Sequence, residues 1–127
     1  MATNYPVGDF LIRIKNAMMA NKKEVVLPQS KFIVAVAKVL KREGFLSEVK
    51  EDRKGTLVVR LAYHKKQPVL VDLKLVSKPG LRIYVGKDEL ERRRGAAILI
   101  LSTPKGIMSS TDALKKGVGG EVIAEIK

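Results

Sequence analysis

Cysteine is absent from this sequence, and histidine occurs once, as His64. The lack of cysteine excludes disulfides, thiolate zinc sites and a thiol nucleophile. No carboxylate pair and no cluster of histidine and acidic residues has the spacing expected of metal ligands. Ser102 and Ser109 have no partner base that the sequence makes evident. We therefore predict that the protein is not an enzyme, with no catalytic residue, metal or cofactor.

Long apolar runs and aromatic residues are also scarce. No run approaches the roughly 20 residues that span a bilayer, and residues 1–20 lack the pattern of a secretion signal. We expect a cytoplasmic protein with no membrane partner. Only three tyrosines and three phenylalanines occur, which disfavours a single-strand binder that stacks bases on an aromatic-rich sheet. Shape and backbone recognition of structured RNA fits this composition better.

Positive charge is what the sequence has in excess. The 127 residues include 25 Lys and Arg against 13 Asp and Glu, for a net charge of +12. The excess is +8 in residues 1–66 and +4 in residues 67–127, so it is not confined to a tail. Such a surplus predicts an acidic partner, nucleic acid first and anionic membrane second. An apolar fraction of 46% is enough for a core.

Hydrophobic periodicity and turn residues predict alternating helices and strands in the first half. Ser30 and Gly44 are suited to begin and end the second helix, and Asp52–Gly55 is suited to a hairpin turn. The inward stripe of the second helix is expected to contain Phe32, Ile33, Val36, Val39 and Leu40. Its lysines and arginine fit a solvated face and a phosphate-facing one equally well. The predicted elements are helices over 9–21 and 30–43 and strands over 24–27, 45–51 and 56–63.

A polar segment over residues 64–68 is the best internal linker, so we expect domains at 1–66 and 67–127. The second half is predicted to be mostly strands. Ser77–Gly80 has the proline and glycine of a type II turn. The expected elements are strands over 69–75, 81–85, 96–101 and 122–126, one helical turn within 87–94 and a short helix near 110–116.

Two turns of small and hydroxylated residues mark the candidate site, Ser102–Gly106 and Gly117–Glu121. Hydroxyls, backbone N–H groups and glycines form a surface that phosphates, sugars and base edges can approach closely. Each turn alone is equally well explained as a tight turn of a β-rich domain, but the pair in so basic a chain indicates a docking surface. Glu121 is expected to lock the glycine turn by accepting hydrogen bonds from backbone N–H groups.

Other motifs are less specific. Gly117–Gly120 lacks the lysine of a P-loop and precedes a strand, so it does not indicate nucleotide binding. Tyr84 and Arg82 share a strand face, which fits an edge of the core or a platform for a base and a phosphate. Arg92–Arg94 fits a solvated loop or a contact to the RNA backbone.

Several of these motifs, in order along the chain, resemble those of small-subunit ribosomal protein eight, bacterial type. The resemblance covers nearly the full length. It departs from the family at Pro104, where serine is usual, and at Leu114, where arginine is usual, so neither position is assigned a contact. The matching motifs are Gly8-Asp9, Arg13–Ala17, Pro28-x-Ser30-Lys31, Arg42–Phe45, Ser77–Gly80 with Arg82–Tyr84, Ser102-Thr103-x-Lys105-Gly106 and Gly117-x-Gly-Gly-Glu121.

The resemblance implies an α+β fold, with an N-terminal α-β-α-β-β domain packed on a mostly antiparallel β C-terminal domain that has a short helix. It implies a structural ribosomal protein, monomeric when free, that binds the central domain of small-subunit ribosomal RNA and helps order it during assembly beside neighbouring ribosomal proteins. The C-terminal domain is expected to make the principal contact, and the N-terminal helix, with Asp9, to touch other RNA. The RNA-binding residues so expected are Ser102, Thr103, Lys105, Gly106, Gly117, Gly119, Gly120, Tyr84, Arg82, Lys78, Arg13, Asn16 and Lys31.

Two other classes of function remain open from the residues alone. A peripheral membrane protein would need a basic amphipathic helix with apolar residues free to insert, whereas the apolar stripes here are needed for the core. An enzyme acting on RNA would have to depend on His64.

Overall fold

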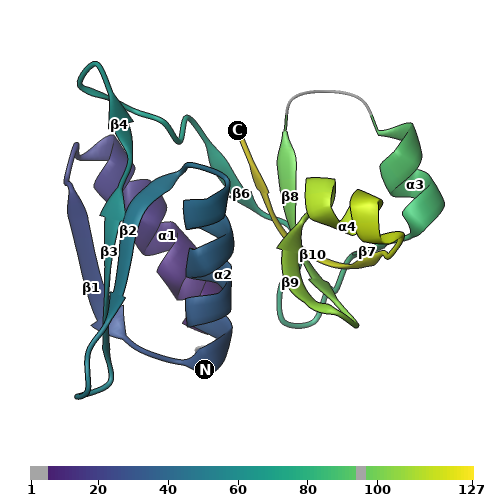
Figure 1. Ribbon diagram of the computed structural model, residues 1–127, viewed down its shortest axis with the longest axis horizontal. Helices are drawn as coiled ribbons and strands as arrows, with labels where there is room; N and C mark the ends of the chain where they lie inside the picture. Colours follow the sequence, from purple (N-terminus) through teal and green to yellow (C-terminus); the bar gives the residue numbers. More distant parts are fainter. Residues whose placement is uncertain (1–5, 94–96) are drawn as a thin grey trace. The chain divides into compact units, whose positions relative to one another are not determined.

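The computed structural model describes residues 6–93 and 97–127. The chain divides into two compact units, residues 6–71 and residues 72–127 (Figure 1). Each unit combines helices with antiparallel strands, so the predicted α+β class is confirmed. No helix in the described ranges is both long and apolar enough to cross a membrane.

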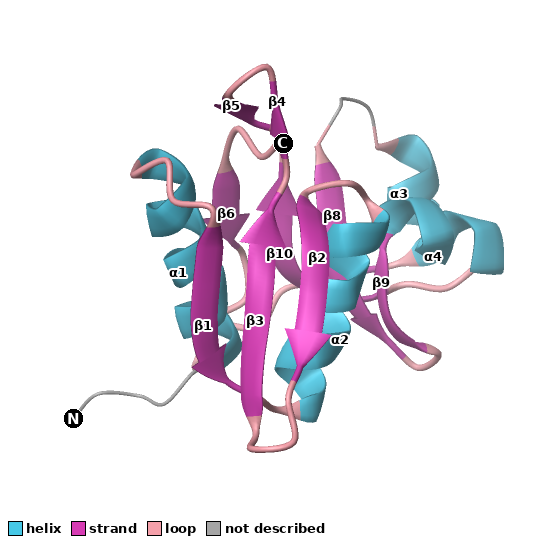
Figure 2. Ribbon diagram, turned by 60° about the vertical axis from the view of Figure 1, so that its left-hand side comes forward, coloured by secondary structure: helices cyan, strands magenta, loops and turns pink. Residues whose placement is uncertain are grey.

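The first unit is a three-stranded antiparallel sheet with two helices on one face (Figures 1 and 2). The strand order β1-β3-β2 places the strand that is last in sequence at the centre. The helices and strands all match predicted segments, with boundaries that differ by a few residues. They are α1 (Pro6–Met19), β1 (Glu24–Pro28), α2 (Lys31–Arg42), β2 (Leu46–Glu51) and β3 (Thr56–Leu61).

Local signals set the limits of α2. The Ser30 hydroxyl accepts a hydrogen bond from the Ile33 N–H at 3.2 Å, as an N-cap should. Gly44, at φ +89, lets the chain leave the helix in a conformation that favours glycine. The predicted stripe is wrong at Phe32, which is 44% exposed, whereas Val34 is buried. The buried stripe of α2 therefore includes Val34, and Phe32 lies at its edge.

The hairpin between β2 and β3 has the predicted turn. One carboxylate oxygen of Asp52 accepts hydrogen bonds from the N–H groups of Lys54 and Thr56, both at 2.9 Å. Gly55 takes the positive φ, +85, that the turn requires. The Asp52 side chain thus closes the turn, and glycine occupies the position with positive φ.

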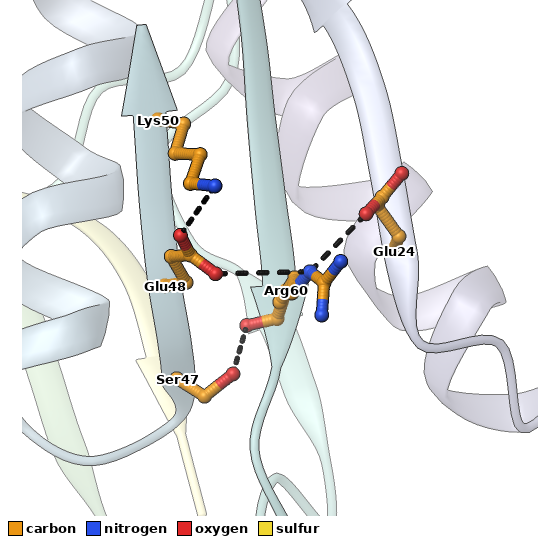
Figure 3. Close-up of polar contacts among 5 residues, drawn as sticks. All are labelled: Glu24, Ser47, Glu48, Lys50 and Arg60. Atoms are coloured by element: carbon orange, nitrogen blue, oxygen red, sulfur yellow. Dashed lines mark hydrogen bonds and ion pairs between the residues drawn. The ribbon is translucent and has the colours of Figure 1, made fainter.

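Charges on the outer face of this sheet are paired with one another (Figure 3). Glu24, Arg60 and Glu48 lie side by side in the register of three strands. The Arg60 Nε lies 3.2 Å from Glu24 and 3.7 Å from Glu48, and the Lys50 Nζ lies 3.0 Å from Glu48. The hydrogen bond from Lys50, with the charges of Lys50 and Arg60, lowers the pKa of Glu48.

The segment predicted as a linker is instead a small hairpin. Strands β4 (Tyr63–His64) and β5 (Gln67–Pro68) pair across a two-residue turn. Lys65 and Lys66 have φ of 51° and 69°, as a type I′ turn requires. The left-handed region costs a residue other than glycine about 1–2 kcal/mol. Lysine gives no sequence signal for such a turn, which is why the hairpin was not predicted.

The second unit contains a five-stranded antiparallel sheet with two short helices. The strand order is β6-β10-β8-β9, and β7 pairs with β10. The strand expected over residues 69–75 is wrong in its first part, because Val69 and Val71 are 37% and 73% exposed and lie outside the strand. The elements are β6 (Leu73–Leu75), β7 (Tyr84–Val85), α3 (Lys87–Arg92), β8 (Ile98–Thr103), β9 (Gly106–Ser109), α4 (Ser110–Lys116) and β10 (Gly120–Ile126).

Both short helices were predicted, and they cover one face of this sheet. Leu90 of α3 and Ala113 of α4 belong to one buried cluster with the strand residues Leu101, Met108 and Val122. Of the basic run at 92–94, Arg92 ends α3 and Arg93 follows it. Arg94 lies outside the described residues, as does the start of the strand expected at Ala96.

Candidate RNA interface

Three predicted site residues lie side by side across strands of the second sheet. In the register, Glu121 of β10 is opposite Tyr84 of β7 on one side and opposite Ser102 of β8 on the other. Ser102 is in turn opposite Ile107 of β9. Residues directly opposite one another point to the same face of a sheet. Their chain neighbours Val85, Leu101, Met108 and Val122 pack toward the helices. Therefore these four residues, which we call the Ser102 row, lie on the face away from α3 and α4.

The two predicted turns adjoin because two glycines let backbones approach closely. A Cβ added to Gly120 would lie 2.2 Å from the Ser102 carbonyl oxygen, and one added to Gly119 would lie 2.3 Å from that of Val85. Neither position can hold a side chain unless the backbone shifts. The glycines are thus explained first by packing: they bring β7, β10 and β8 together where the Ser102 row begins.

Gly117 has another reason to be glycine. It ends α4 in the left-handed conformation, at φ +68, and its N–H donates to the Leu114 carbonyl oxygen. The helix stop and the two close approaches together place the glycine turn beside β8. This turn lies at the surface: Gly117 is exposed and Gly119 and Gly120 are half-buried.

The Ser102–Gly106 turn is closed by the Thr103 hydroxyl. This hydroxyl donates to the Gly106 carbonyl oxygen at 2.8 Å and accepts from the Lys105 N–H at 3.1 Å. Gly106, at φ +116, takes the left-handed position. Pro104, which lacks an N–H, occupies the exposed tip. The half-buried Ser102 hydroxyl has no hydrogen-bond partner among the described residues, so it remains available to a ligand.

Tyr84 forms the β7 end of the Ser102 row, and Arg82 joins the row through Glu121. Tyr84 is 67% exposed, which favours a ligand platform over an edge of the core. The Arg82 Nη1 lies 3.1 Å from Glu121 Oε2. The predicted bonds from backbone N–H groups to Glu121 are not found among the described residues. The Glu121 carboxylate pairs with Arg82 instead.

The turn that contains Lys78 is fixed to β10 by a chain of hydrogen bonds. Lys78 and Leu81 exchange two backbone hydrogen bonds of 2.9 Å, and Gly80 has the positive φ expected of the type II turn. The buried Ser77 hydroxyl accepts from the Ile83 N–H at 2.9 Å, and the Ile83 carbonyl accepts from the Val122 N–H at 2.8 Å. Lys78 itself is exposed.

Two residues at this interface were not predicted. Lys87, the first residue of α3, extends its side chain over Gly117: a Cβ there would lie 3.9 Å from the Lys87 Nζ. It brings a cation to the glycine turn, where Leu114 supplies none. Ile107 enters the Ser102 row. The sequence could have revealed Ile107: if the two strands pair outward from the turn, residue 103 faces 106 and residue 102 faces 107. Lys87 could not have been found this way, because only the fold brings it to Gly117.

The remaining candidates lie in the first unit. Arg13 and Asn16 are exposed on α1 and line one pocket of about 420 Å³, and Arg13 donates to the Val26 carbonyl oxygen at 3.3 Å. Lys31, the first residue of α2, lines a different pocket of about 650 Å³ with Lys38 and Arg53. The structure therefore brings Arg13 and Asn16 together, but places Lys31 in a separate pocket.

The serines and histidine considered as catalytic groups have other roles or no partners. The buried Ser109 hydroxyl caps α4 by accepting from the Asp112 N–H at 3.2 Å. His64 is exposed on β4. Within residues 6–93 and 97–127, no group of three His, Asp or Glu side chains could hold a metal.

Comparison with known proteins identifies the family. The model of the family described as ribosomal protein S8 matches residues 5–126. The chain belongs to the ribosomal protein S8 family. Proteins named small ribosomal subunit protein uS8 match it over nearly their full length. That of Pelagibacter ubique is 45% identical over 99% of both chains, and that of Hydrogenovibrio crunogenus 47% identical over 99% of both. That of Acinetobacter baumannii is 47% identical over 98% of both.

Membership of the S8 family confirms the resemblance inferred from the motifs. The family consists of structural proteins of the small ribosomal subunit rather than enzymes, so the prediction of a non-enzymatic protein is confirmed. The expected location, on the cytoplasmic ribosome, follows from the same membership.

Proposed function

We propose that this protein binds the central domain of small-subunit ribosomal RNA and helps order it during assembly of the subunit. The principal contact is the unit over residues 72–127. The observation that carries this proposal is the Ser102 row together with Arg82: a hydroxyl with no partner among the described residues and an exposed tyrosine share one face, and an arginine is ion-paired to Glu121. The S8 family membership of the chain supports it.

In this proposal the side chains of the Ser102 row and the cations around it have different roles. Ser102 exchanges hydrogen bonds with a 2′-hydroxyl or a base edge, and Tyr84 stacks on a base or ribose. Arg82, Lys105 and Lys78 contact phosphates, which supplies affinity that depends on salt. Lys87 provides a further cation beside the glycine turn.

Thr103 and the glycines act mainly by shaping the surface. The Thr103 hydroxyl holds the turn and has one lone pair left for RNA. Gly106, Gly117, Gly119 and Gly120 let RNA approach the backbone while they keep the strands together.

Further contacts come from the unit over residues 6–71. Arg13 and Asn16 bind a separate part of the RNA from α1, and Lys31 adds a phosphate contact from the start of α2. We propose that the protein is a monomer when free and contacts neighbouring small-subunit proteins once assembled.

A filter-binding titration with a central-domain RNA fragment tests the site. Removing the Ser102 hydroxyl with Ser102→Ala is expected to weaken binding about twofold to tenfold, since one hydrogen bond is worth roughly 0.5–1.5 kcal/mol. Thr103→Ala should weaken binding and lower the melting temperature, because the Lys105 N–H loses its acceptor. Thr103→Ser keeps the hydroxyl and should restore both.

Ser47→Ala is the matched control, because Ser47 is an exposed strand serine of the other unit. It should leave binding unchanged. If Ser102→Ala and Thr103→Ala both bind as tightly as the wild-type protein, the interface lies elsewhere.

A further inference from the structure

The tip of the β4–β5 hairpin combines backbone strain with positive charge. Its two turn residues, Lys65 and Lys66, both have positive φ. Type I′ turns favour Asn-Gly at these positions, because a larger side chain is crowded there. A strained conformation at non-glycine residues persists where the surrounding structure fixes it, and it often marks a functional position. Figure 2 shows this hairpin, β4 and β5, beyond the end of β3.

Hydrogen bonds fix the hairpin to the loop between α1 and β1. The Tyr63 hydroxyl donates to the Lys22 carbonyl oxygen at 2.6 Å. The Leu61 N–H donates to the Lys23 carbonyl oxygen at 3.0 Å, and the Val69 N–H closes the base of the hairpin on Ala62 at 2.9 Å. The tip is therefore held in place, and two lysines of the loop are held next to it.

The lysines at this end of the unit have no acidic partner among the described residues. Lys23 and Lys66 line one pocket of about 520 Å³ together with Arg60, and none of its lining residues is acidic. Arg60 is paired with glutamates, but none of the lysines at 22, 23, 65 and 66 has an ion pair within the described part of the chain. We call these four exposed residues the lysine tip.

Stability of the fold alone explains why lysine occurs at two of the four positions of the lysine tip. Lys22 and Lys23 follow the C-terminal end of α1, where cations are favourable. That reason does not extend to the hairpin turn, where neutral Asn-Gly would reverse the chain with less strain. The β2–β3 hairpin, at the other end of β3, shows the ordinary solution: it also has Arg53 and Lys54, but the positive φ falls on Gly55.

We propose that the lysine tip is a phosphate-binding surface that grips structured RNA separately from the Ser102 row and adjoins Arg13 and Asn16, whose pocket Lys22 also lines. This inference rests on the proposed RNA-binding function. Lysine ammonium groups act as point charges on phosphates and read no sequence. The lysine tip therefore adds affinity for the ribosomal RNA, and the Ser102 row selects the site.

Two double variants separate charge from strain. Lys65→Gln/Lys66→Gln removes the charge and keeps the strained turn, whereas Lys65→Asn/Lys66→Gly removes both. Lys50→Gln/Lys54→Gln is the matched control, because it removes two charges from the β2–β3 hairpin outside the pocket that Lys31 lines. Binding to full small-subunit ribosomal RNA is measured over a range of salt concentrations, and thermal unfolding is recorded for each protein.

Both Lys65/Lys66 variants are expected to bind roughly fivefold more weakly for each phosphate that they no longer neutralise, with a salt slope shallower by about one for each. Only the Asn-Gly variant should melt at a higher temperature than the wild-type protein. The control should match the wild-type protein in affinity and salt slope. Together these results would establish that the lysines are kept for their charge.

Unchanged affinity in both Lys65/Lys66 variants would overturn the proposal, and so would an equal loss in the control, which would mean that only total charge matters. Loss of incorporation into reconstituted small subunits with full affinity for isolated RNA would also overturn it and point to an acidic protein partner. If the wild-type protein binds no ribosomal RNA, the proposed function fails as well; binding that Ser102→Ala weakens and the lysine variants do not would reject this inference alone.

Discussion

The two sheets of the molecule use the face away from their helices in opposite ways. On the first sheet, Glu24, Arg60, Glu48 and Lys50 pair with one another across neighbouring strands. On the second, the Ser102 row combines a hydroxyl without a described partner with an exposed tyrosine, and an ion pair connects its Glu121 to Arg82. A face whose charges already pair has less to offer an anionic ligand.

If the Ser102 row is the RNA interface, as we propose, then positive charge alone does not locate it. The first half of the chain has the larger excess of positive charge. Nevertheless, the middle of its sheet face is balanced by two glutamates, and the lysine tip lies at one end. The second half has less net charge, but its sheet holds the polar groups of the Ser102 row in fixed positions. Charge supplies attraction, whereas the arrangement of hydrogen-bonding groups supplies fit.

The largest expected effect comes from disrupting the close approach of β8 and β10 in the second sheet. Gly120→Ala would place a methyl group against the Ser102 carbonyl oxygen, where a Cβ would lie at 2.2 Å. We expect a loss of about 3 kcal/mol in the free energy of unfolding, as for a severe overpacking. RNA binding should fall with it, because β8 and β10 must move apart. Urea denaturation and filter binding measure the two effects.

Gly86→Ala is the control for this substitution. Gly86 has a negative φ of −89°, and the nearest atom to its added Cβ is a side-chain oxygen of Glu89 at 3.9 Å. Its cost should stay within about 1 kcal/mol. If Gly120→Ala is as mild as Gly86→Ala, the close approach of the strands does not define the platform.

A smaller effect is expected when the ion pair of the Ser102 row is neutralised. Glu121→Gln keeps the shape of the side chain but removes the charge that anchors Arg82. We expect RNA affinity to fall about threefold to tenfold, because Arg82 and the segment with Tyr84 lose their fixed orientation. The cost in stability should be below about 1 kcal/mol, since Arg82 is 45% exposed in its side chain and exposed pairs contribute little.

The sign of this change separates two roles for the carboxylate. An increase in affinity would show that Glu121 acts mainly by repelling phosphates. Glu125→Gln, on the same strand but beyond the Ser102 row, is the matched control and should leave the affinity for the RNA fragment nearly unchanged.

Much of the fold could be predicted because its signals are local. Ser30 caps α2, Gly44 ends it, and Asp52 closes the turn that Gly55 completes; each acts within a few residues of its partner. The type II turn at Ser77–Gly80 was predicted for the same reason. Phe32 was misplaced because a stripe defined by period alone does not say where its edge lies.

The site was predicted as two turns, but its construction was not. Gly119 and Gly120 look like ligand-binding glycines in the sequence, yet their nearest constraint is the backbone of Val85 and Ser102. The pair of Arg82 and Glu121 joins residues that are far apart in the chain, and no local pattern announces it. The Lys65–Lys66 turn contradicts the usual residue preference, so pattern reasoning assigns it to a linker.

The smallest expected effect concerns the paired charges of the first sheet and depends on pH. The pKa of Glu48 is lowered from its ordinary value of 4.5, first by the hydrogen bond from Lys50. A carboxyl group whose pKa is lower in the folded state stabilises the fold above that ordinary value, and the contribution is lost as pH falls through the lowered pKa. The melting temperature of Glu48→Gln should therefore lie slightly below that of the wild-type protein at pH 7.

The two melting temperatures should converge as pH falls below 4.5, because protonated Glu48 then resembles glutamine in charge. RNA affinity at pH 7 should not change, since the charges of this face pair with one another rather than with RNA. A clear change in affinity for Glu48→Gln would mean that the first sheet also takes part in binding, and the contrast between the two faces would then be wrong.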